Sequence, residues 1–403
     1  MGPDAYLQIK ASTLPPAQPT YVLRGHGAQI HAVSFLRHNT RLLTGDAEGW
    51  VVLWSVALKR AVAVWRAHQG SILGLQSWGV DRTMTHGRDN KINVWQLPVA
   101  DEVCFSTVLP IDDTTSHRKQ PWLLHCLIVN ALNFCPFATC TTDPDATKGA
   151  PSSTEEADGT ILIAVPGTQD AQIDIFSLPS EQIAFRIPAL ANTKTGMVMA
   201  LRMLHHQGRL LVAAGYESGH ACTWRREGAT GTWDTTYTSK AHSQPILSLD
   251  IAPPLGVFYT SSADAVIARH PLDPDTAAAA TALAPKQIQT KHAGQQDLRL
   301  RSDAKIFATA GWDGRIRVYS AKTMKELAVL KWHRDGCYAT AFATVAAQPI
   351  AATTDSGSGE GDDGKQVARA CTTVEQRRDA KAQSTHWLAA GSKDGKVSLW
   401  DIY

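Results

Sequence analysis

Four residue types recur in a fixed order along this chain of 403 residues: a histidine, a hydroxyl residue, an acid and a tryptophan. The two clearest sets are His26, Thr44, Glu48 and Trp54, followed by His68, Thr85, Asp89 and Trp95. Histidine, hydroxyl and carboxylate are also the groups of a hydrolytic triad, in which the imidazole activates the hydroxyl. Such a nucleophile must be exposed and must have an oxyanion site beside it. Here the trio repeats and ends on an indole among apolar residues, so we interpret it as structural and expect no enzymatic activity.

These sets belong to a longer pattern, an interval of ten residues between a small residue and an aromatic-type residue. Seven copies keep the interval: Thr44 to Trp54, Thr85 to Trp95, Pro166 to Phe176, Ala214 to Trp224, Thr260 to His270, Thr309 to Tyr319 and Ala390 to Trp400. A turn signal follows each small residue, and it suits a tight hairpin between two antiparallel strands. The residues after the turn are rich in β-branched and aromatic types, as strands are. The pattern therefore predicts an all-β fold, a seven-bladed β-propeller.

The spacing of the repeats also predicts the domain organisation. Two of the intervals, Trp95 to Phe176 and Tyr319 to Trp400, are much longer than the others but contain no second anchored pair. Each holds a polar, low-complexity stretch with few bulky apolar groups, which cannot offset the entropy lost on ordering. We expect flexible insertions at about 139–159 and 351–384, inside the third and seventh blades, within one domain that spans residues 1–403.

The ring is expected to close through its N-terminal part. The sequence stops just after the third strand of the last blade, so that blade lacks an outer strand. Residues 20–24, which read TYVLR, have the composition and the position to supply it. A borrowed strand of this kind would remove two open sheet edges.

Composition narrows the function classes. The chain is 44% hydrophobic and 19% charged, and its net charge of +2 argues against a protein that mainly neutralises nucleic-acid phosphates. No apolar run approaches the roughly 18 residues that cross a bilayer, and the first residues lack the pattern of a signal peptide. Seven cysteines without a Cys-x-x-Cys pair favour reduced thiols inside the cell. We expect no direct nucleic-acid contact, no membrane, no metal and no cofactor.

The order Gly-His, Ser/Thr, Asp and Trp resembles the WD repeat, in which the four side chains form a hydrogen-bonded tetrad within each blade. By this resemblance, the two sets named first are tetrads. The departures at Pro166, Phe176, Ser218 and His270 imply weaker tetrads in blades three to five. Segments 23–26, 39–46, 49–54, 64–68, 85–91 and 388–396 are also similar to a narrower group, the fungal ASTRA-associated WD-repeat proteins. The animal relative of that group is a G-protein β-subunit-like WD-repeat protein.

The resemblance implies a non-catalytic scaffold subunit of the ASTRA complex, which acts in chromatin remodelling, telomere maintenance and maturation of phosphatidylinositol-3-kinase-like kinases. The implied partners are the other ASTRA subunits, including large helical-repeat co-chaperone proteins, with AAA+ ATPases as a further expectation. The chain would be a monomer within that hetero-complex, in the nucleus and secondarily in the cytoplasm. Two alternatives stay open, a peptide or histone reader and a ubiquitin-ligase substrate receptor. The Trp-Asp-x-Arg sequence common in such receptors is absent after Trp54, Trp95 and Trp400.

One arc of the ring is the candidate partner-binding surface. The residue just before each turn acid is expected to point to the same rim, and three of these residues are Trp312, Lys393 and Arg88 in blades six, seven and two. Tryptophan and arginine dominate the energetics of protein interfaces. The alternative is that Trp312 shields a tetrad and that the two basic residues are merely solvated.

Overall fold

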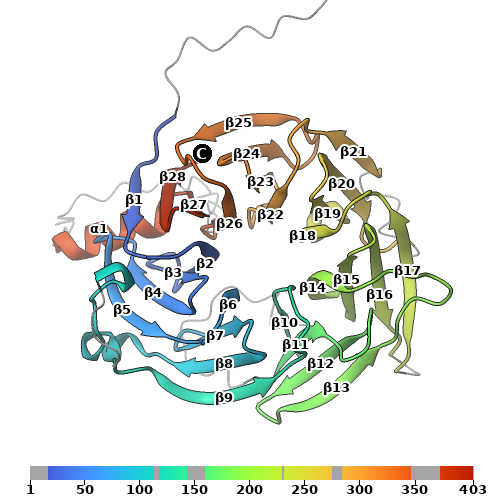
Figure 1. Cartoon of the computed structure of the whole chain (residues 1–403), viewed down its shortest axis with the longest axis horizontal. Coiled ribbons are helices and arrows are strands. Elements are labelled where there is room, and N and C mark those ends of the chain that lie inside the picture. The colour runs from blue at the N-terminus through green and yellow to red at the C-terminus, as the bar shows by residue number, and fades with distance from the viewer. Residues whose placement is uncertain are drawn as a thin grey trace, which may run out of the picture.

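The computed structural model describes residues 17–112, 118–142, 159–228, 231–274, 284–345 and 373–402. Seven antiparallel sheets of four strands each stand in a ring around a central channel (Figure 1). The predicted all-β fold, a seven-bladed propeller, is confirmed. Most of both expected insertions, residues 143–158 and 351–372, lies outside the described residues.

Each blade runs from an inner strand at the channel to an outer strand at the circumference (Figure 1). Blades one and two consist of β2 (Ile30–Leu36), β3 (Arg41–Asp46), β4 (Trp50–Ser55) and β5 (Arg60–Arg66), then β6 (Ile72–Trp78), β7 (Arg82–Gly87), β8 (Lys91–Gln96) and β9 (Trp122–Ile128). Blades three and four consist of β10 (Ala138–Thr141), β11 (Ile161–Pro166), β12 (Ile173–Leu178) and β13 (Gln182–Ile187), then β14 (Val198–His206), β15 (Arg209–Tyr216), β16 (His220–Arg226) and β17 (Trp233–Lys240).

The remaining blades follow the same order. Blades five and six consist of β18 (Ile246–Ala252), β19 (Val257–Ser262), β20 (Val266–Pro271) and β21 (Lys286–Gln289), then β22 (Gln295–Leu300), β23 (Ile306–Gly311), β24 (Arg315–Ser320) and β25 (Glu326–Lys331). Blade seven consists of β26 (Cys337–Phe342), β27 (Trp387–Ser392), β28 (Lys396–Asp401) and β1 (Tyr21–Arg24). The expected closure is confirmed, because β1 pairs with β28 from Tyr21 opposite Leu399 to Arg24 opposite Lys396.

Adjacent blades interlock where a glycine in the second strand of one blade meets an isoleucine in the first strand of the next. A Cβ atom at Gly45 would lie 2.7 Å from Ile72, and a Cβ atom at Gly391 would lie 2.4 Å from Ile30. Both isoleucines are fully buried, so any larger residue at these glycines would collide with packed core. Because Gly391 belongs to blade seven and Ile30 to blade one, the same contact also closes the ring.

The second insertion is not flexible throughout, and the prediction is wrong for its last part. Residues 374–384 form the helix α1 (Val374–Ser384). Thr373 caps it, since its hydroxyl accepts the Gln376 N–H at 3.2 Å while the Gln376 side chain accepts the Thr373 N–H at 2.9 Å. Ala382 is buried, and its carbonyl accepts the Trp387 indole N–H at 3.1 Å. The Asn39 side chain also donates to the Gln383 carbonyl at 3.3 Å. A capping box and these contacts order a segment whose polar composition predicts flexibility.

A segment between β8 and β9 was not predicted at all, because the long Trp95–Phe176 interval had been assigned to one insertion. It contains the short 3-10 helices η1 (Val99–Cys104) and η2 (Pro110–Asp112) and crosses the outer edge of blade one. The Ser106 carbonyl accepts the Val64 N–H of β5 at 2.9 Å, and the Ile111 N–H donates to the Gly25 carbonyl at 2.9 Å. The segment therefore ties blade two to blade one and to the chain that enters it.

None of the helices within the described ranges, α1 included, combines the length and the hydrophobicity needed to cross a bilayer.

Candidate partner-binding site

The predicted tetrad of blade two is present with all four of its residues. His68 Nδ1 lies 2.8 Å from an Asp89 carboxylate oxygen, and His68 Nε2 lies 2.8 Å from the Thr85 hydroxyl. The Trp95 indole N–H donates to the same hydroxyl at 2.9 Å. Burial would raise the pKa of Asp89, but hydrogen bonds from His68 and from the Gln69 N–H outweigh it and hold that pKa below its usual value. The tetrad thus joins the loop before the blade to its second and third strands.

In blade one the predicted acid is wrong. His26 Nδ1 contacts Asp46 at 2.8 Å, whereas Glu48 is exposed. Asp46 is fully buried, and its second oxygen accepts the backbone N–H groups of Glu48 and Trp50 at 2.9 and 3.0 Å. An acid at the end of the second strand already reaches the histidine, so the acid inside the turn is left in solvent.

The rest of the blade-one tetrad is as predicted. His26 Nε2 lies 2.7 Å from the Thr44 hydroxyl, and the Trp54 indole N–H donates to that hydroxyl at 2.8 Å.

Blade five keeps its tetrad although His270 stands where tryptophan was expected. His242 Nε2 lies 2.8 Å from the Thr260 hydroxyl, and His270 Nε2 lies 2.9 Å from the same oxygen. The His270 ring stacks on Phe258 with centroids 4.7 Å apart. Burial, followed by the charge of His242, lowers the pKa of His270 to about 3, so the ring is neutral. The expectation of a weakened tetrad is therefore wrong for this blade, because the imidazole replaces both the packing of the indole and its hydrogen bond with the threonine hydroxyl.

These polar sets do not offer catalytic chemistry. The hydroxyls of Thr44 and Thr85 are fully buried, and each is already engaged by a histidine and a tryptophan. A substrate cannot reach them, so the histidine, hydroxyl and acid act as cross-links between strands. Within the described residues, no group of three or more His, Cys, Asp or Glu side chains is placed to hold a metal ion.

The three predicted rim residues occupy equivalent positions on the ring. The backbone N–H groups of Arg88, Trp312 and Lys393 each donate at 2.9 Å to a carbonyl of the loop that enters the same blade. All three side chains are exposed. Since blades six, seven, one and two are consecutive in the ring (Figure 1), the three residues follow one arc of one rim, as expected.

Two of these side chains are held in place by neighbours that were not predicted. The Trp312 indole N–H donates to the Gln296 side-chain oxygen at 2.8 Å. Its ring lies against Gly294, where φ is +74° and where a Cβ atom would lie 2.1 Å from the indole, so only glycine fits. The Arg88 guanidinium sits over the Phe134 ring at 4.5 Å from its centroid. Both exposed groups are therefore oriented in advance, which reduces the entropy lost when a partner binds.

A second row of side chains lines the mouth of the central channel. The first strands of blades one, two and four to seven have a bulge at their second residue. In blades one, two, five, six and seven the residues there are His31, Leu73, Leu247, Gln296 and Tyr338. A bulge re-aims a side chain, and all five line a cavity of about 400 Å³ in the channel. The His31 and Tyr338 rings lie 5.5 Å apart between blades one and seven.

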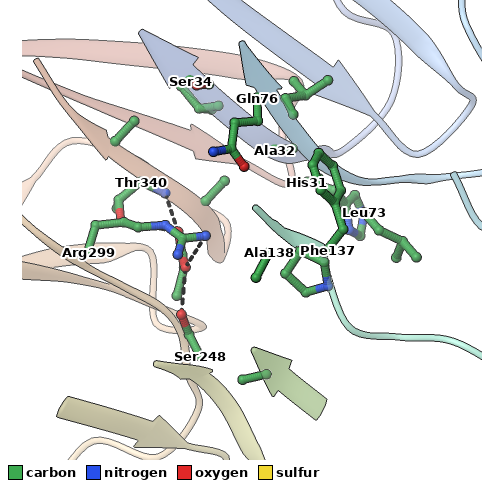
Figure 2. Close-up of a pocket in the computed structure, with 18 of the residues that line it drawn as sticks. His31, Ala32, Ser34, Leu73, Gln76, Phe137, Ala138, Ser248, Arg299 and Thr340 are labelled. Atoms are coloured by element: carbon green, nitrogen blue, oxygen red, sulfur yellow. Dashed lines mark hydrogen bonds and ion pairs between the residues drawn. The ribbon is translucent and has the colours of Figure 1, made fainter. Parts of the chain in front are cut away.

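Figure 2 shows that Gln76, His31, Ser248, Arg299 and Thr340 surround this cavity. At its wall the buried carboxylate of Asp297 accepts the Ser248 hydroxyl at 2.9 Å and the Thr340 N–H at 2.8 Å. Burial raises the pKa of Asp297 to about 6, although these donors oppose the rise. At the mouth, burial lowers the pKa of His31, Asp46 opposes this and Arg88 adds to it, so the ring is neutral at pH 7.

We define the rim site as the surface formed by Trp312, Gln296, Tyr338, His31, Arg88, Phe134 and Lys393. Sequence reasoning found the three outermost members and missed the four nearer the channel. Three of the missed residues could have been found from the repeat pattern, because Gln296, Tyr338 and His31 all hold the second position of the first strand of their blade. Phe134 lies in the loop between β9 and β10 and has no counterpart in that pattern.

The chain is similar to one set of fungal proteins over nearly its whole length. A family model described as ASTRA-associated protein 1 matches residues 19–400. The protein named ASTRA-associated protein 1 from Verticillium alfalfae is 49% identical over 397 residues, covering 98% of this chain and 95% of the relative. The protein of the same name from Schizosaccharomyces pombe is 34% identical over 349 residues, covering 80% of this chain and 93% of the relative.

Proposed function

This chain belongs to the ASTRA-associated protein 1 family, and on that premise we propose that it is a scaffold subunit of the ASTRA complex that binds a partner through the rim site. Support for membership comes from relatives that carry the name of the complex and match almost the full chain. Support for a scaffold comes from the buried, cross-linking tetrads, which make a rigid ring with no exposed nucleophile among them.

The observation that carries the rim site is the pre-oriented pair of exposed anchors. Trp312, which is 47% exposed, is fixed by Gln296 and Gly294, and Arg88 is fixed by Phe134. Large aromatic and arginine side chains that are already held in one conformation are the residues that anchor interfaces most strongly. The neutral His31 ring and the ring of Tyr338 lie between these two anchors, so a partner would meet an aromatic surface flanked by cations.

The finer role follows from the family resemblance. We propose that the chain helps the complex in chromatin remodelling, telomere maintenance and maturation of phosphatidylinositol-3-kinase-like kinases. Its direct partners would be large helical-repeat co-chaperone subunits, with AAA+ ATPases as more distant ones. It would act in the nucleus and, while kinases mature, in the cytoplasm. It would contribute no catalysis of its own.

Affinity capture of the full chain, followed by cross-linking mass spectrometry, tests this proposal. The wild-type chain should recover large helical-repeat subunits, with cross-links next to the rim site. The double variant Trp312→Ala and Arg88→Glu should recover at least tenfold less of them while keeping the wild-type melting temperature. The matched control is Gln169→Glu, which places a new charge on an exposed residue of blade three, outside the arc.

Two outcomes would count against different parts of the proposal. If the wild-type chain recovers no subunit of the complex, membership is refuted. If the double variant recovers as much as the wild type, the rim site is not the binding surface, although membership stands.

A further inference from the structure

The outer strand of blade two differs from the other outer strands in its chemistry. Residues 122–128 of β9 read WLLHCLI and contain no Lys, Arg, Asp or Glu. Each of the other six outer strands in the described part of the chain carries at least one such charge, for example Arg24, Arg60, Arg186, Lys240, Lys286 and Lys331. Charges on an edge strand normally prevent other chains from pairing with it. β9 lacks that protection.

Several apolar side chains of β9 are exposed. Trp122 is 74% exposed and Ile128 is 77% exposed, and Leu124 between them is also exposed. A bulge at Leu124 interrupts the alternation of the strand, so Ile128 shares a face with Leu123, which is 44% exposed, while Trp122 lies on the other face. The middle of the face that carries Trp122 is covered, since Leu127 is buried and His125 Nδ1 contacts a Glu181 carboxylate oxygen of blade three at 2.7 Å.

The backbone edge of β9 is open as well. β9 is the last strand of its sheet, and among the described residues no backbone hydrogen bond joins its outer edge to another segment. In the neighbouring blade the outer strand β5 is different, because its Val64 N–H donates to the Ser106 carbonyl of the unpredicted segment. The chain thus covers part of one outer edge and leaves the more apolar one bare.

Cations stand at both ends of this bare strand. Lys91 is paired opposite Ile128 at one end. At the other end Lys119 is exposed, and the contact of Gln120 Nε2 with the Arg66 carbonyl at 3.2 Å places a second basic residue nearby. Two copies of β9 would bring like charges together in either orientation, which disfavours self-pairing. An extended segment with acidic residues at its ends would match these charges.

We propose that β9 is a second docking surface, at which an extended segment of a partner protein adds a fifth strand to blade two. The segment would carry apolar residues on both of its faces, to cover Trp122, Leu124 and Ile128, and acidic residues at its ends. Main-chain hydrogen bonds to the open edge supply affinity in this mode, and alternate side chains supply specificity. The exposed apolar surface continues through Leu132 to Phe134, so the same partner can reach the rim site.

Selection from a displayed library of random dodecapeptides on the immobilised full chain tests this inference. Enriched peptides are expected to be apolar in their middle part and to end in Asp or Glu. Their affinity, measured by fluorescence anisotropy, should fall at least tenfold for the double variant Trp122→Lys and Ile128→Lys. Hydrogen exchange of the β9 amides should slow when such a peptide is bound. Both substituted side chains are largely exposed, so the fold should be retained, and the single variant Ile128→Lys serves as a second check.

The matched control is Leu327→Lys on β25, another outer strand, where the leucine is 56% exposed. This variant should bind the peptides as the wild type does. Any of three results would overturn the inference. The selected peptides could bind the double-lysine variant as well as the wild type, the selection could enrich no peptide, or hydrogen exchange of the β9 amides could stay unchanged when a peptide is bound. A wild-type dimer that the double-lysine variant dissolves would overturn it too, by making a second copy the occupant. The rim variants of Trp312 and Arg88 should keep peptide binding, so the two proposals can fail separately.

Discussion

Ser398 lies directly opposite Ala390 across strands β28 and β27, and it supplies the hydroxyl that the alanine lacks. Its Oγ accepts the Trp400 indole N–H at 2.8 Å and lies 2.8 Å from His333 Nε2. In blades one and two a threonine of the second strand makes these contacts. Blade seven therefore keeps its tetrad by moving the hydroxyl to the adjacent strand.

Replacing this hydroxyl should destabilise the ring. Ser398→Ala leaves the Trp400 N–H and a ring nitrogen of His333 buried without a partner, at a cost of about 1–3 kcal/mol in the free energy of unfolding. Denaturant titration of the full chain measures it. Adding Ala390→Thr restores a hydroxyl on the other strand and should recover part of the loss. An unchanged transition in the single variant would show that the hydroxyl is dispensable.

Substitutions of Asp46 and Glu48 should change the free energy of unfolding by very different amounts, although the two residues are only two positions apart. Asp46→Ala removes the acceptor of the His26 ring and of two backbone N–H groups, so we expect a loss of about 1–3 kcal/mol. Glu48→Ala changes an exposed side chain and should stay within about 0.5 kcal/mol of the wild type. Thermal unfolding of the two variants side by side provides the comparison. The opposite ranking would restore Glu48 as the tetrad acid.

Glu102 should hold the segment between β8 and β9 firmly against blade one. Its carboxylate binds the side chains of Arg37 and Arg41, and all three are largely buried. Glu102→Ala leaves two guanidinium groups without their acid, which costs about 3–5 kcal/mol when such a buried pair is broken. The exposed pair Arg209 and Glu227 is the control, and Arg209→Ala should cost at most about 1 kcal/mol. Equal losses in the two variants would contradict this assignment.

Asp297 should make stability fall as pH rises in the acid range. Its pKa is about 6 in the folded chain and about 4 when unfolded, so between these values the folded state holds the proton that the unfolded state releases. Folding is therefore favoured below this window and loses that advantage as pH rises through it. Asp297→Asn lacks the titration, so its stability relative to the wild type should improve from pH 5 to pH 7.5. Melting temperatures at the two pH values measure this, and a constant difference would contradict it.

The blades could be predicted from short-range sequence patterns because each blade is built from hairpins, and a hairpin is a local structure. Thr44 and Trp54, or Thr85 and Trp95, lie within one pair of adjacent strands, and the turn between them sets the register. The same locality explains the errors. The helix 374–384 and the segment after β8 are held by contacts with residues far away in the sequence, such as the Asn39 side chain and the Val64 N–H, and no short-range pattern carries a trace of those contacts.

The candidate site divides in the same way. Arg88, Trp312 and Lys393 could be predicted because they hold the same place beside each turn. Phe134 could not, because its contact with Arg88 depends on how the loop after β9 crosses the rim.

The sequence by itself determined the number of blades, their strands and the borrowed strand at the seam, since these follow from residue types repeated at short range. Only the tertiary structure decided which residues that are far apart in the sequence come into contact. The Asn39 side chain donates to the Thr344 carbonyl at 2.8 Å from 305 residues away, and His333 finds its hydroxyl on Ser398 rather than at the expected position of Ala390. Such contacts arise when closure of the ring brings remote residues together, and no local spacing encodes them.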